Sequence, residues 1–403
     1  MKKYIPIAEM LWFQEGPGVR NTQYTSSGVK LLNVANLVDG VLDITNTDRY
    51  ISEDEAYNRY KHFLVDDGDL IIASSGIKVE YFDKKMGFAK KEQLPLCMNT
   101  STIRFKVLNK EQVSIRYFMY YLKSEHFKEQ LNHQITGSAQ LNFGPSHLKK
   151  MLFPIVEMET QQQIVRKLDV LHGIENRLRQ ELSLLDQLVK SRFIELFGDP
   201  DGNPMNWETA ELERHLEIVG GFAFKSEGFA DSGIPVLRIG NINSGHFLPV
   251  NMVFWPEDPS LARYKMYPGD LVMSLTGTVG KDDYGNVCVL SDEYPEYYLN
   301  QRNAKLAIGA TLNRHYLSEM LKFSRIKKRL TGISRGVRQA NISNRDILAL
   351  RVPIPPIKLQ EQFAAFVEQT DKSKYYSSLS FRYCQAAENA YRQEWITCRT
   401  SDF

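Results

Sequence analysis

The sequence predicts an α+β protein with two similar globular domains and two long helices that form an antiparallel coiled coil with pseudo-two-fold symmetry. Two observations predict this fold. A junction of prolines followed by glutamines occurs twice, as FPIVEMETQQQ (residues 153–163) and VPIPPIKLQEQ (residues 352–362). Each junction opens a long stretch with helical periodicity, so both halves of the chain end in the same way.

Three further motifs recur in the same order, each roughly 200 residues later in the chain. They are GVKLLNVANL (28–37) with GIPVLRIGNI (233–242), DGDLIIASSG (67–76) with PGDLVMSLTG (268–277), and TGSAQLN (136–142) with TGISRGVRQAN (331–341). A series of motifs in one constant order indicates an internal duplication rather than chance.

Each copy begins with short runs that are typical of strands, because Gly, Asp, Asn and Pro bound them. The runs are KLLNV, DLIIAS and TIRFKV in the first copy and PVLRI, DLVMSL and AKLAI in the second. A helix is predicted before each TG motif, over residues 116–131 and 315–330. Strands and helices together predict an α+β domain in each copy.

The first long helix is predicted over residues 160–197, with one apolar stripe along it. At about 1.5 Å per residue, such a helix is roughly 57 Å long. Glu175 interrupts the stripe, and GDPDGNP (198–204) ends the helix. The steps of three and four residues predict helix-to-helix packing. The stripe consists of Ile164, Leu168, Leu171, Leu178, Leu182, Leu185 and Val189.

The second long helix is predicted from Leu359 to about Trp395, and its pattern is less regular. SKYYSSLS (373–380) is a weak stretch within it. We expect the two long helices to pack on each other, because each has an apolar face to bury. The apolar face of the second helix would contain Phe363, Phe366, Val367, Phe381 and Tyr391.

Composition describes a folded protein with nearly balanced charge. Of 403 residues 43% are hydrophobic, and 50 Lys and Arg stand against 48 Asp and Glu. The four cysteines form no CxxC pair, so no metal site is predicted. No apolar run is long enough for a membrane span and no signal peptide is visible, so we expect a cytoplasmic protein without membrane contact.

Motifs for catalysis are missing from the sequence. An adenine methyltransferase needs an Asn/Asp-Pro-Pro-aromatic loop to hold a flipped base, and IPPI (354–357) lacks both the amide and the aromatic residue. No GxxxxGK[ST] loop for ATP occurs. We therefore expect no catalytic residues and no cofactor bound by this chain.

Two similar domains joined by a helical spacer suit a ligand with repeating features, such as duplex DNA. Half-sites one helical turn apart, about 34–36 Å, lie on the same face of the duplex. Lys and Arg contact phosphates, whereas Arg, Asn and Gln read base edges. Three pairs of loops concentrate such residues, and their candidates for DNA contact are Arg20, Lys78, Gln140, Lys225, Thr276, Thr278, Lys281, Arg335, Arg338 and Gln339.

Simpler interpretations of these loops remain open. Each glycine-rich loop is equally well explained as a β-turn. Asn142 and Asn341 are each expected to cap the short helix that follows, in preference to reading a base.

The whole chain resembles the specificity (S) subunit of a Type I restriction–modification system. The resemblance rests on PIPPIKLQEQ with PIVEMETQQQIV, on LVKSRFIELFGDP, on GDLVMSLTGTVGK, on the TG…QAN elements and on NPMNWE. It implies a target recognition domain at residues 1–156, a spacer helix at 157–199, a second target recognition domain at 200–355 and a C-terminal spacer helix at 356–403. Each domain would read one half of a split, asymmetric DNA site.

The resemblance also implies partners. Two methyltransferase (M) subunits would dock on the helices, and restriction/translocase (R) subunits would join them. S-adenosylmethionine, ATP and Mg²⁺ would serve those partner subunits and not this chain. Candidates for docking are the apolar helix residues Ile164, Leu168, Leu171, Leu178, Leu182, Leu185, Val189, Phe363 and Phe366.

Two other classes of function stay open from the sequence. One is a non-enzymatic, two-headed adaptor or structural coiled-coil protein that binds other proteins. The other is an enzyme whose motif is not recognisable.

Overall fold

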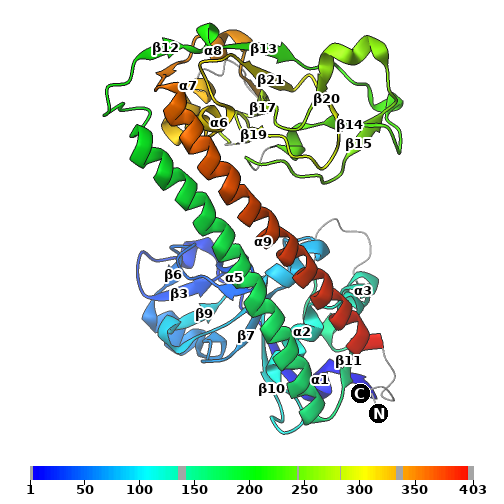
Figure 1. Ribbon diagram of the computed structural model, residues 1–403. Coiled ribbons are helices and arrows are strands. Elements are labelled where there is room, and N and C mark those ends of the chain that lie inside the picture. The colour runs from blue at the N-terminus through cyan, green and yellow to red at the C-terminus, as the bar shows by residue number, and fades with distance from the viewer. Residues whose placement is uncertain (1–2, 135–141, 243–244, 282, 333–338, 398–403) are drawn as a thin grey trace. The chain divides into compact units, whose positions relative to one another are not determined.

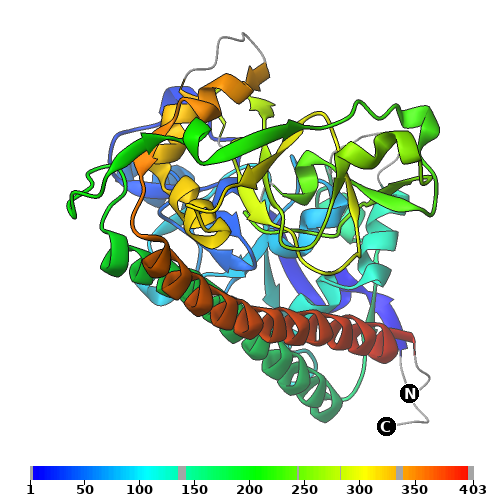
Figure 2. The same cartoon turned by 45° about the horizontal axis from the view of Figure 1, so that its top comes forward.

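The computed structural model describes residues 3–134, 142–242, 245–281, 283–332 and 339–397. The chain forms two compact units (Figures 1 and 2), and both long helices contribute to each of them. Unit 1 contains Met1–Leu178 and Ser380–Phe403, and unit 2 contains Arg179–Leu379. Within the described ranges, no helix combines the length and apolarity that a membrane crossing needs.

The main sheet of unit 1 has four antiparallel strands in the order β2-β10-β7-β8. The chain passes through them as β2 (Leu11–Glu15), β7 (Leu70–Ala73), β8 (Met86–Phe88) and β10 (Thr102–Val107). The strand β7 is buried on both faces, which explains why its sequence, LIIA, is continuously apolar. A second, smaller sheet has the order β6-β3-β9, from β3 (Val29–Leu32), β6 (Tyr50–Ile51) and β9 (Leu96–Met98).

Unit 2 repeats this topology, which confirms the duplication predicted from the sequence. Its main sheet, β13-β21-β17-β19, consists of β13 (Leu216–Gly220), β17 (Leu271–Ser274), β19 (Val287–Val289) and β21 (Asn303–Ile308). Its second sheet, β15-β14-β20-β16, consists of β14 (Ile234–Leu237), β15 (Val253–Trp255), β16 (Lys265–Met266) and β20 (Tyr297–Leu299). As in unit 1, two strands of the second sheet pair in parallel, here β14 with β20 and there β3 with β9.

A two-stranded ribbon closes each unit beside its proline junction. In unit 1, β1 (Lys3–Pro6) pairs with β11 (Leu152–Ile155), and in unit 2, β12 (Thr209–Glu211) pairs with β23 (Arg351–Pro353). The start of each copy is thereby held against its end.

Two expectations about the short helices were wrong. Each helix predicted before the TG motif is a pair, α2 (Ile115–Leu122) with α3 (Glu125–Gln134) and α6 (Arg314–Lys322) with α7 (Ser324–Thr331). The hydroxyl of Ser124 accepts a 3.3 Å hydrogen bond from the amide of Phe127, as a residue at the start of a new helix does.

The asparagine caps were also misplaced. The residues that precede α4 (Pro145–Leu148) and α8 (Asn344–Leu348) are Gly144 and Ser343. Asn142 instead forms a β-bridge with Ser75, and Asn341 pairs with Thr276. The two asparagines therefore tie strand-like segments together.

The long helices are α5 (Met158–Phe197) and α9 (Ile357–Thr397), close to the predicted bounds. Within unit 1, the carbonyl oxygen of Leu171 accepts a 3.3 Å hydrogen bond from Sγ of Cys384, and the amine of Lys167 lies 4.9 Å over the ring of Tyr391. Within unit 2, Glu181 accepts a 3.0 Å bond from Ser377, and Asp186 lies 2.8 Å from Lys374. Partner numbers on α9 fall as those on α5 rise, so the helices pair antiparallel in both units (Figure 1).

The seam of α9 is a heptad that the apolar pattern did not reveal. Its buried positions follow steps of three and four residues or their sums, but several carry polar side chains. Phe366 and Phe381, predicted for this face, are only partly buried. The buried seam residues are Phe363, Val367, Thr370, Ser377, Cys384, Glu388 and Trp395.

Candidate nucleic-acid interface

In unit 1, three of the candidate segments meet at one edge of the main sheet. The amide of Gly16, just after β2, donates a 3.0 Å hydrogen bond to the carbonyl of Thr102. The amide of Ser74, just after β7, donates to Ser101 at 2.8 Å, and Ser74 in turn accepts from the amide of Phe143 at 3.0 Å. The segments that contain Arg20, Lys78 and the end of the TG motif are thereby gathered at one place.

Unit 2 brings the corresponding segments together in the same way. The strand β18 (Thr276–Thr278) pairs with β22 (Gln339–Asn341), so Thr278 lies opposite Gln339. The amide of Leu275, just before β18, donates a 2.8 Å hydrogen bond to the carbonyl of Arg302, and the amide of Gln301 donates at 2.9 Å to the carbonyl of Phe222, in the loop after β13. Candidates that are far apart in the sequence therefore share one sheet edge.

A glycine at the start of the first loop is needed in both units. A Cβ atom on Gly16 would lie 2.2 Å from the carbonyl oxygen of Asn99, and one on Gly221 would lie 2.1 Å from that of Asn300. Such contacts are impossible for any other residue, so glycine lets each loop cross its neighbouring strand. The Gly-rich character of these loops has a packing cause, and it does not by itself indicate DNA contact.

The candidate cations are exposed at this edge. Arg20 and Lys225 each precede a short 3-10 turn, Asn21–Gln23 and Ser226–Gly228, and Lys78 precedes another, Val79–Lys84. The side chains of Arg20, Lys78, Lys225 and Lys281 all face solvent.

The threonine candidates lie on an ordered ribbon. Thr278 is exposed and Thr276 partly so. The amide of Thr278 donates a 2.8 Å hydrogen bond to Oδ1 of Asp283, and this bond lowers the pKa of Asp283. An ionised carboxylate therefore holds the backbone of Thr278 at the end of β18.

Part of the predicted set lies outside the described residues. Gln140, Arg335 and Arg338 fall in the undescribed segments 135–141 and 333–338. Gln339 is placed on β22 through its backbone pairing.

The docking candidates on the helices need a correction. Ile164, Leu168, Val189 and Phe363 are buried in the cores of their own units, so they are not free to bind another subunit. Leu171, Leu178, Leu182, Leu185 and Phe366 are partly buried. The seam serves the packing of this chain, as the antiparallel pairing requires.

A second apolar stripe on α5 remains uncovered within each unit. Its members are Val170 and Ile174 in unit 1 and Leu184 and Leu188 in unit 2, all exposed. Each of the four directly precedes a predicted seam residue or Glu175, so the stripe lies about 100° around the helix from the seam.

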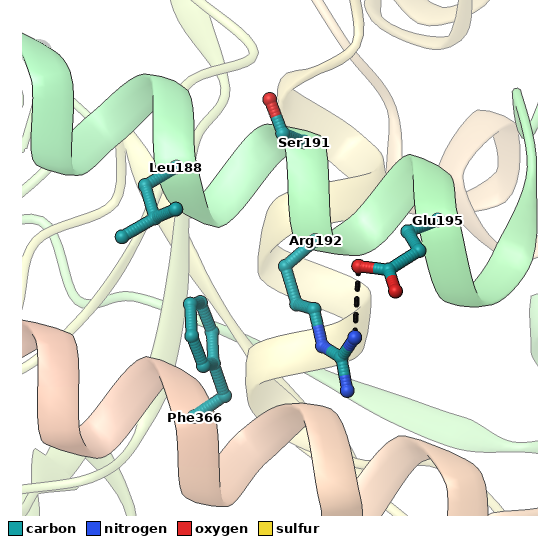
Figure 3. Close-up of a pocket in the computed structure, with 5 residues that line it drawn as sticks. All are labelled: Leu188, Ser191, Arg192, Glu195 and Phe366. Atoms are coloured by element: carbon teal, nitrogen blue, oxygen red, sulfur yellow. Dashed lines mark ion pairs between the residues drawn. The ribbon is translucent and has the colours of Figure 1, made fainter.

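In unit 2 this stripe borders an open groove of about 440 Å³ between α5 and α9. Figure 3 shows Leu188 on α5 and Phe366 on α9 at this groove, and the ion pair of Arg192 with Glu195 along α5. The ion-pair atoms are 2.8 Å apart. The groove thus has an apolar part and a charged part.

A different hollow in unit 1, of about 580 Å³, includes Trp12, Arg104 and Lys106. Its cations are already engaged. Arg104 donates to the carbonyl of His62 at 2.6 Å and lies 3.3 Å from Asp69, and Lys106 pairs with Asp66. Both cations also lie over the Trp12 ring, so this hollow offers little unsatisfied charge.

Among the described residues, His172, Glu175 and Glu388 bring possible metal-ligand atoms within 4.8 Å of one another. Their charge is already balanced, since Glu388 pairs with Arg392 and the amine of Lys123 lies in the same region. The pKa of Lys123 is lowered, first by burial and then by Arg392, although Glu388 and Glu175 oppose this. This cluster is a polar interruption of the seam, and Glu175 marks it in the sequence.

Comparisons with known proteins agree with this architecture. A family model described as the Type I restriction modification DNA specificity domain matches residues 23–184 and again residues 204–375. The putative type I restriction enzyme MjaX specificity subunit of Methanocaldococcus jannaschii is 25% identical over 175 residues, 42% of this chain and 40% of that protein. The type I restriction enzyme EcoKI specificity subunit of Escherichia coli K12 is 22% identical over 183 residues, 42% and 38% of the two chains. The alignments thus span about two-fifths of these relatives.

Among solved structures, a Type-I restriction-modification system S subunit from M. genitalium has a similar fold. Its TM-score is 0.58 at 14% identity, and the match covers 99% of this chain and 97% of that one. The two matches to the family model together span far more than half of the residues of this chain. The chain therefore belongs to the Type I restriction modification DNA specificity domain family and carries two copies of that domain.

Proposed function

We propose that this chain is the DNA sequence-specificity subunit of a Type I restriction–modification complex. The observation that carries the proposal is the repeated sheet edge, where exposed cations and polar ribbons gather on the same scaffold in both units. The residues on the two edges differ, so each unit would read a different short sequence. The target would be a split, asymmetric DNA site.

The domain plan follows the duplication. Residues 1–156 and 200–355 serve as target recognition domains, and the helices at 157–199 and 356–403 set the spacing between the half-sites. Arg20, Lys78, Gln140, Lys225, Thr276, Thr278, Lys281, Arg335, Arg338 and Gln339 are the proposed DNA contacts.

The chain acts without chemistry of its own in this proposal. Two M subunits bind S-adenosylmethionine and methylate the site, and R subunits use ATP and Mg²⁺. The complex works in the cytoplasm, where its DNA substrate is.

We assign M-subunit docking to the second apolar stripe of α5 rather than to the seam. Exposed apolar positions that line a helix are typical of a surface that another protein covers. Leu188, which lines the groove of unit 2, and Leu184, about one turn earlier on α5, are the proposed centre of the contact there.

Methylome sequencing tests this function. The chain is expressed with its M subunits in a host that lacks adenine methylation, and methylated positions are mapped. We expect one split sequence, methylated only when this chain is present. Replacement of residues 200–355 by the corresponding domain of another S subunit should change only one half of the sequence.

Two results would contradict the proposal. Methyl transfer by the isolated chain would make it an enzyme. A chain that binds proteins but neither DNA nor an M subunit would be the two-headed adaptor.

A further inference from the structure

Each sheet edge contains one further segment, a turn that leads from the second sheet of the unit into its main sheet. In unit 1 this turn spans residues 99–102, between β9 and β10, and in unit 2 it spans residues 300–303, between β20 and β21. No sequence motif singles it out. Its backbone nevertheless connects the two polar segments of the edge, the first loop and the segment that pairs with the end of the TG motif.

The two turns are equivalent, because the same hydrogen bond closes each of them. The amide of Thr102 donates a 3.3 Å bond to the carbonyl of Asn99, and the amide of Asn303 donates a 2.9 Å bond to that of Asn300. The strands that follow, β10 and β21, also pair with equivalent neighbours, β2 and β7 in unit 1 and β13 and β17 in unit 2. The central residues of the two turns can therefore be compared one for one.

The first central residue of each turn is bound to the first loop. The amide of Thr100 donates a 2.9 Å hydrogen bond to the carbonyl of Pro17, and the amide of Gln301 donates a 2.9 Å bond to that of Phe222. Both carbonyls belong to the loop that also carries the exposed cation of its unit. The turn is thereby fixed beside that cation.

The second central residue is bound on the other side. The carbonyl of Ser101 accepts a 2.8 Å hydrogen bond from the amide of Ser74, and the carbonyl of Arg302 accepts a 2.8 Å bond from that of Leu275. Each donor directly precedes the segment that pairs with the end of the TG motif. Because these backbone groups hold the edge together, only the side chains of the central residues are free to vary.

Those side chains differ between the units. Unit 1 has Thr100 and Ser101, whereas unit 2 has Gln301 and Arg302, which are both exposed. Within the parts of the chain that the structure describes, the guanidinium of Arg302 has no hydrogen-bond or ion-pair partner. Its donors are therefore available to a ligand.

The backbone of the two turns differs at one central residue. Ser101 has φ 77°, in the left-handed region that residues with a Cβ atom rarely adopt. Arg302 does not lie in this region, so its long side chain extends from an ordinary backbone conformation. Side chains can therefore be exchanged at the turn of unit 2 without backbone strain.

The chemistry of these two side chains suits base edges. The sugar-phosphate backbone carries no sequence information, so residues that differ between equivalent positions suit bases better than phosphates. In the major groove, arginine bonds to O6 and N7 of guanine, and glutamine bonds to N6 and N7 of adenine, each with two hydrogen bonds. Serine and threonine discriminate less, because their hydroxyl groups bond to several bases.

We propose that the turn at residues 300–303 reads bases in the half-site of unit 2, with the guanidinium of Arg302 on a guanine and the carboxamide of Gln301 on an adenine. The proposal rests on the proposed function, because it assumes that this edge faces DNA. It assigns Gln301 and Arg302 as residues that determine specificity.

The test uses the chain in complex with its M subunits and maps the methylated sequence for Arg302→Ala and Gln301→Ala. We expect each variant to accept more than one base pair at one position, in the half that exchange of residues 200–355 alters. The other half should keep its sequence. The Arg302→Ala complex should bind the mapped duplex roughly tenfold to a hundredfold more weakly, and an unrelated duplex as the wild type does.

Two control variants accompany these. Arg214 is exposed and precedes β13, whereas the first loop follows that strand, so Arg214→Ala removes the same charge away from the edge. It should change neither the methylated sequence nor the affinity for either duplex. The double variant Gln301→Thr with Arg302→Ser carries the side chains of unit 1, and it should relax both positions while its thermal unfolding stays that of the wild type.

An unchanged methylated sequence for both Arg302→Ala and Gln301→Ala would overturn this assignment. Equal weakening of the mapped and the unrelated duplex would make Arg302 a phosphate contact, and this result would overturn it as well. A wild-type complex that methylates no split sequence would instead overturn the proposed function, so the two failures are distinguishable.

Discussion

The backbone amide of Ser114 donates a 2.9 Å hydrogen bond to Oε1 of Gln161, the glutamine that opens the first long helix. Nε2 of Gln161 donates in turn to the carbonyls of Gln112 and Val156, at 2.7 and 2.8 Å. This fully buried carboxamide joins the turn before α2, the proline junction and the first turn of α5. The repeated junction therefore fixes how each helix leaves its domain.

Unit 2 contains the same arrangement around Gln360. The amide of Asn313 donates to Oε1 of Gln360 at 2.8 Å. Nε2 of Gln360 donates to the carbonyls of Thr311 and Pro355. The proline–glutamine motif is thus explained by one hydrogen-bond pattern that is needed twice.

Replacing either glutamine should destabilise its unit. Gln161→Ala or Gln360→Ala leaves one buried amide and two carbonyls without this partner, and each unsatisfied group costs about 1–3 kcal/mol. We expect a clear drop in the free energy of unfolding, measured by urea denaturation. Gln162 and Gln362 are exposed, so Gln162→Ala and Gln362→Ala are the controls. Equal stability of Gln161→Ala and Gln162→Ala would refute this role.

The end of α9 is anchored in unit 1 by Trp395, which is 1% exposed. Its ring centroid lies 5.0 Å from that of Tyr117, within the core cluster that also contains Ile164 and Leu168. Trp395→Ala should cost about 3–5 kcal/mol of unfolding free energy, because it leaves a large cavity.

The comparison for this prediction lies on the same helix. Tyr383 is 69% exposed, so Tyr383→Ala should change stability by less than about 0.5 kcal/mol. Trp395→Phe should lose less unfolding free energy than Trp395→Ala, since the phenyl ring fills part of the cavity. Thermal unfolding that is unaltered by Trp395→Ala would show that the helix end is not docked.

Sequence patterns were sufficient for the elements with strong periodicity. The bounds of α5 and α9 were predicted within about two residues, because prolines before each helix and the glycine after α5 mark them. The duplication was visible because strand-bounding motifs keep their order. The topology of each sheet followed from neither signal, since strand pairing joins residues far apart in the chain.

The missed features have a common physical cause. The seam of α9 contains Thr370, Ser377 and Glu388, which a search for apolar periodicity passes over. The polar group of Ser377 is paired with Glu181 on α5, and that of Glu388 with Arg392, one turn later on α9. Ile164, Leu168, Val189 and Phe363 were named as docking candidates for the converse reason, because an apolar stripe does not say whether its own chain or another covers it.

Stability of unit 2 should fall in mild acid because of His315. Burial lowers the pKa of His315, and Arg314 lowers it further, although Asp371 and Glu368 oppose this. The unfolded imidazole titrates near pH 6.5, about its ordinary pKa, and so binds more protons than the folded one below that pH. The free energy of unfolding therefore decreases as pH falls below about 6.5.

This prediction is checked by comparing urea midpoints at about pH 7.5 and about pH 5.5. His315→Gln should lose less unfolding free energy than the wild type between these two pH values. His62→Gln, at an exposed position of unit 1, should behave like the wild type. An equal loss for all three proteins would assign the acid sensitivity to other groups.

A charge on the second stripe of α5 should separate this chain from the proposed M subunit without unfolding it. Leu184 and Leu188 are 53% and 49% exposed, so neither contributes much to the core of unit 2. A glutamate buried at either place in an interface would lose its hydration, and the cation one turn from Leu188, Arg192, already pairs with Glu195, so the charge costs several kcal/mol. We expect Leu188→Glu to weaken association with the M subunit by at least tenfold, measured by titration of the two purified proteins. Gln187→Glu adds the same charge at an exposed neighbouring position and should have little effect. Undiminished association of Leu188→Glu, with its thermal unfolding unchanged, would move the docking surface away from this stripe.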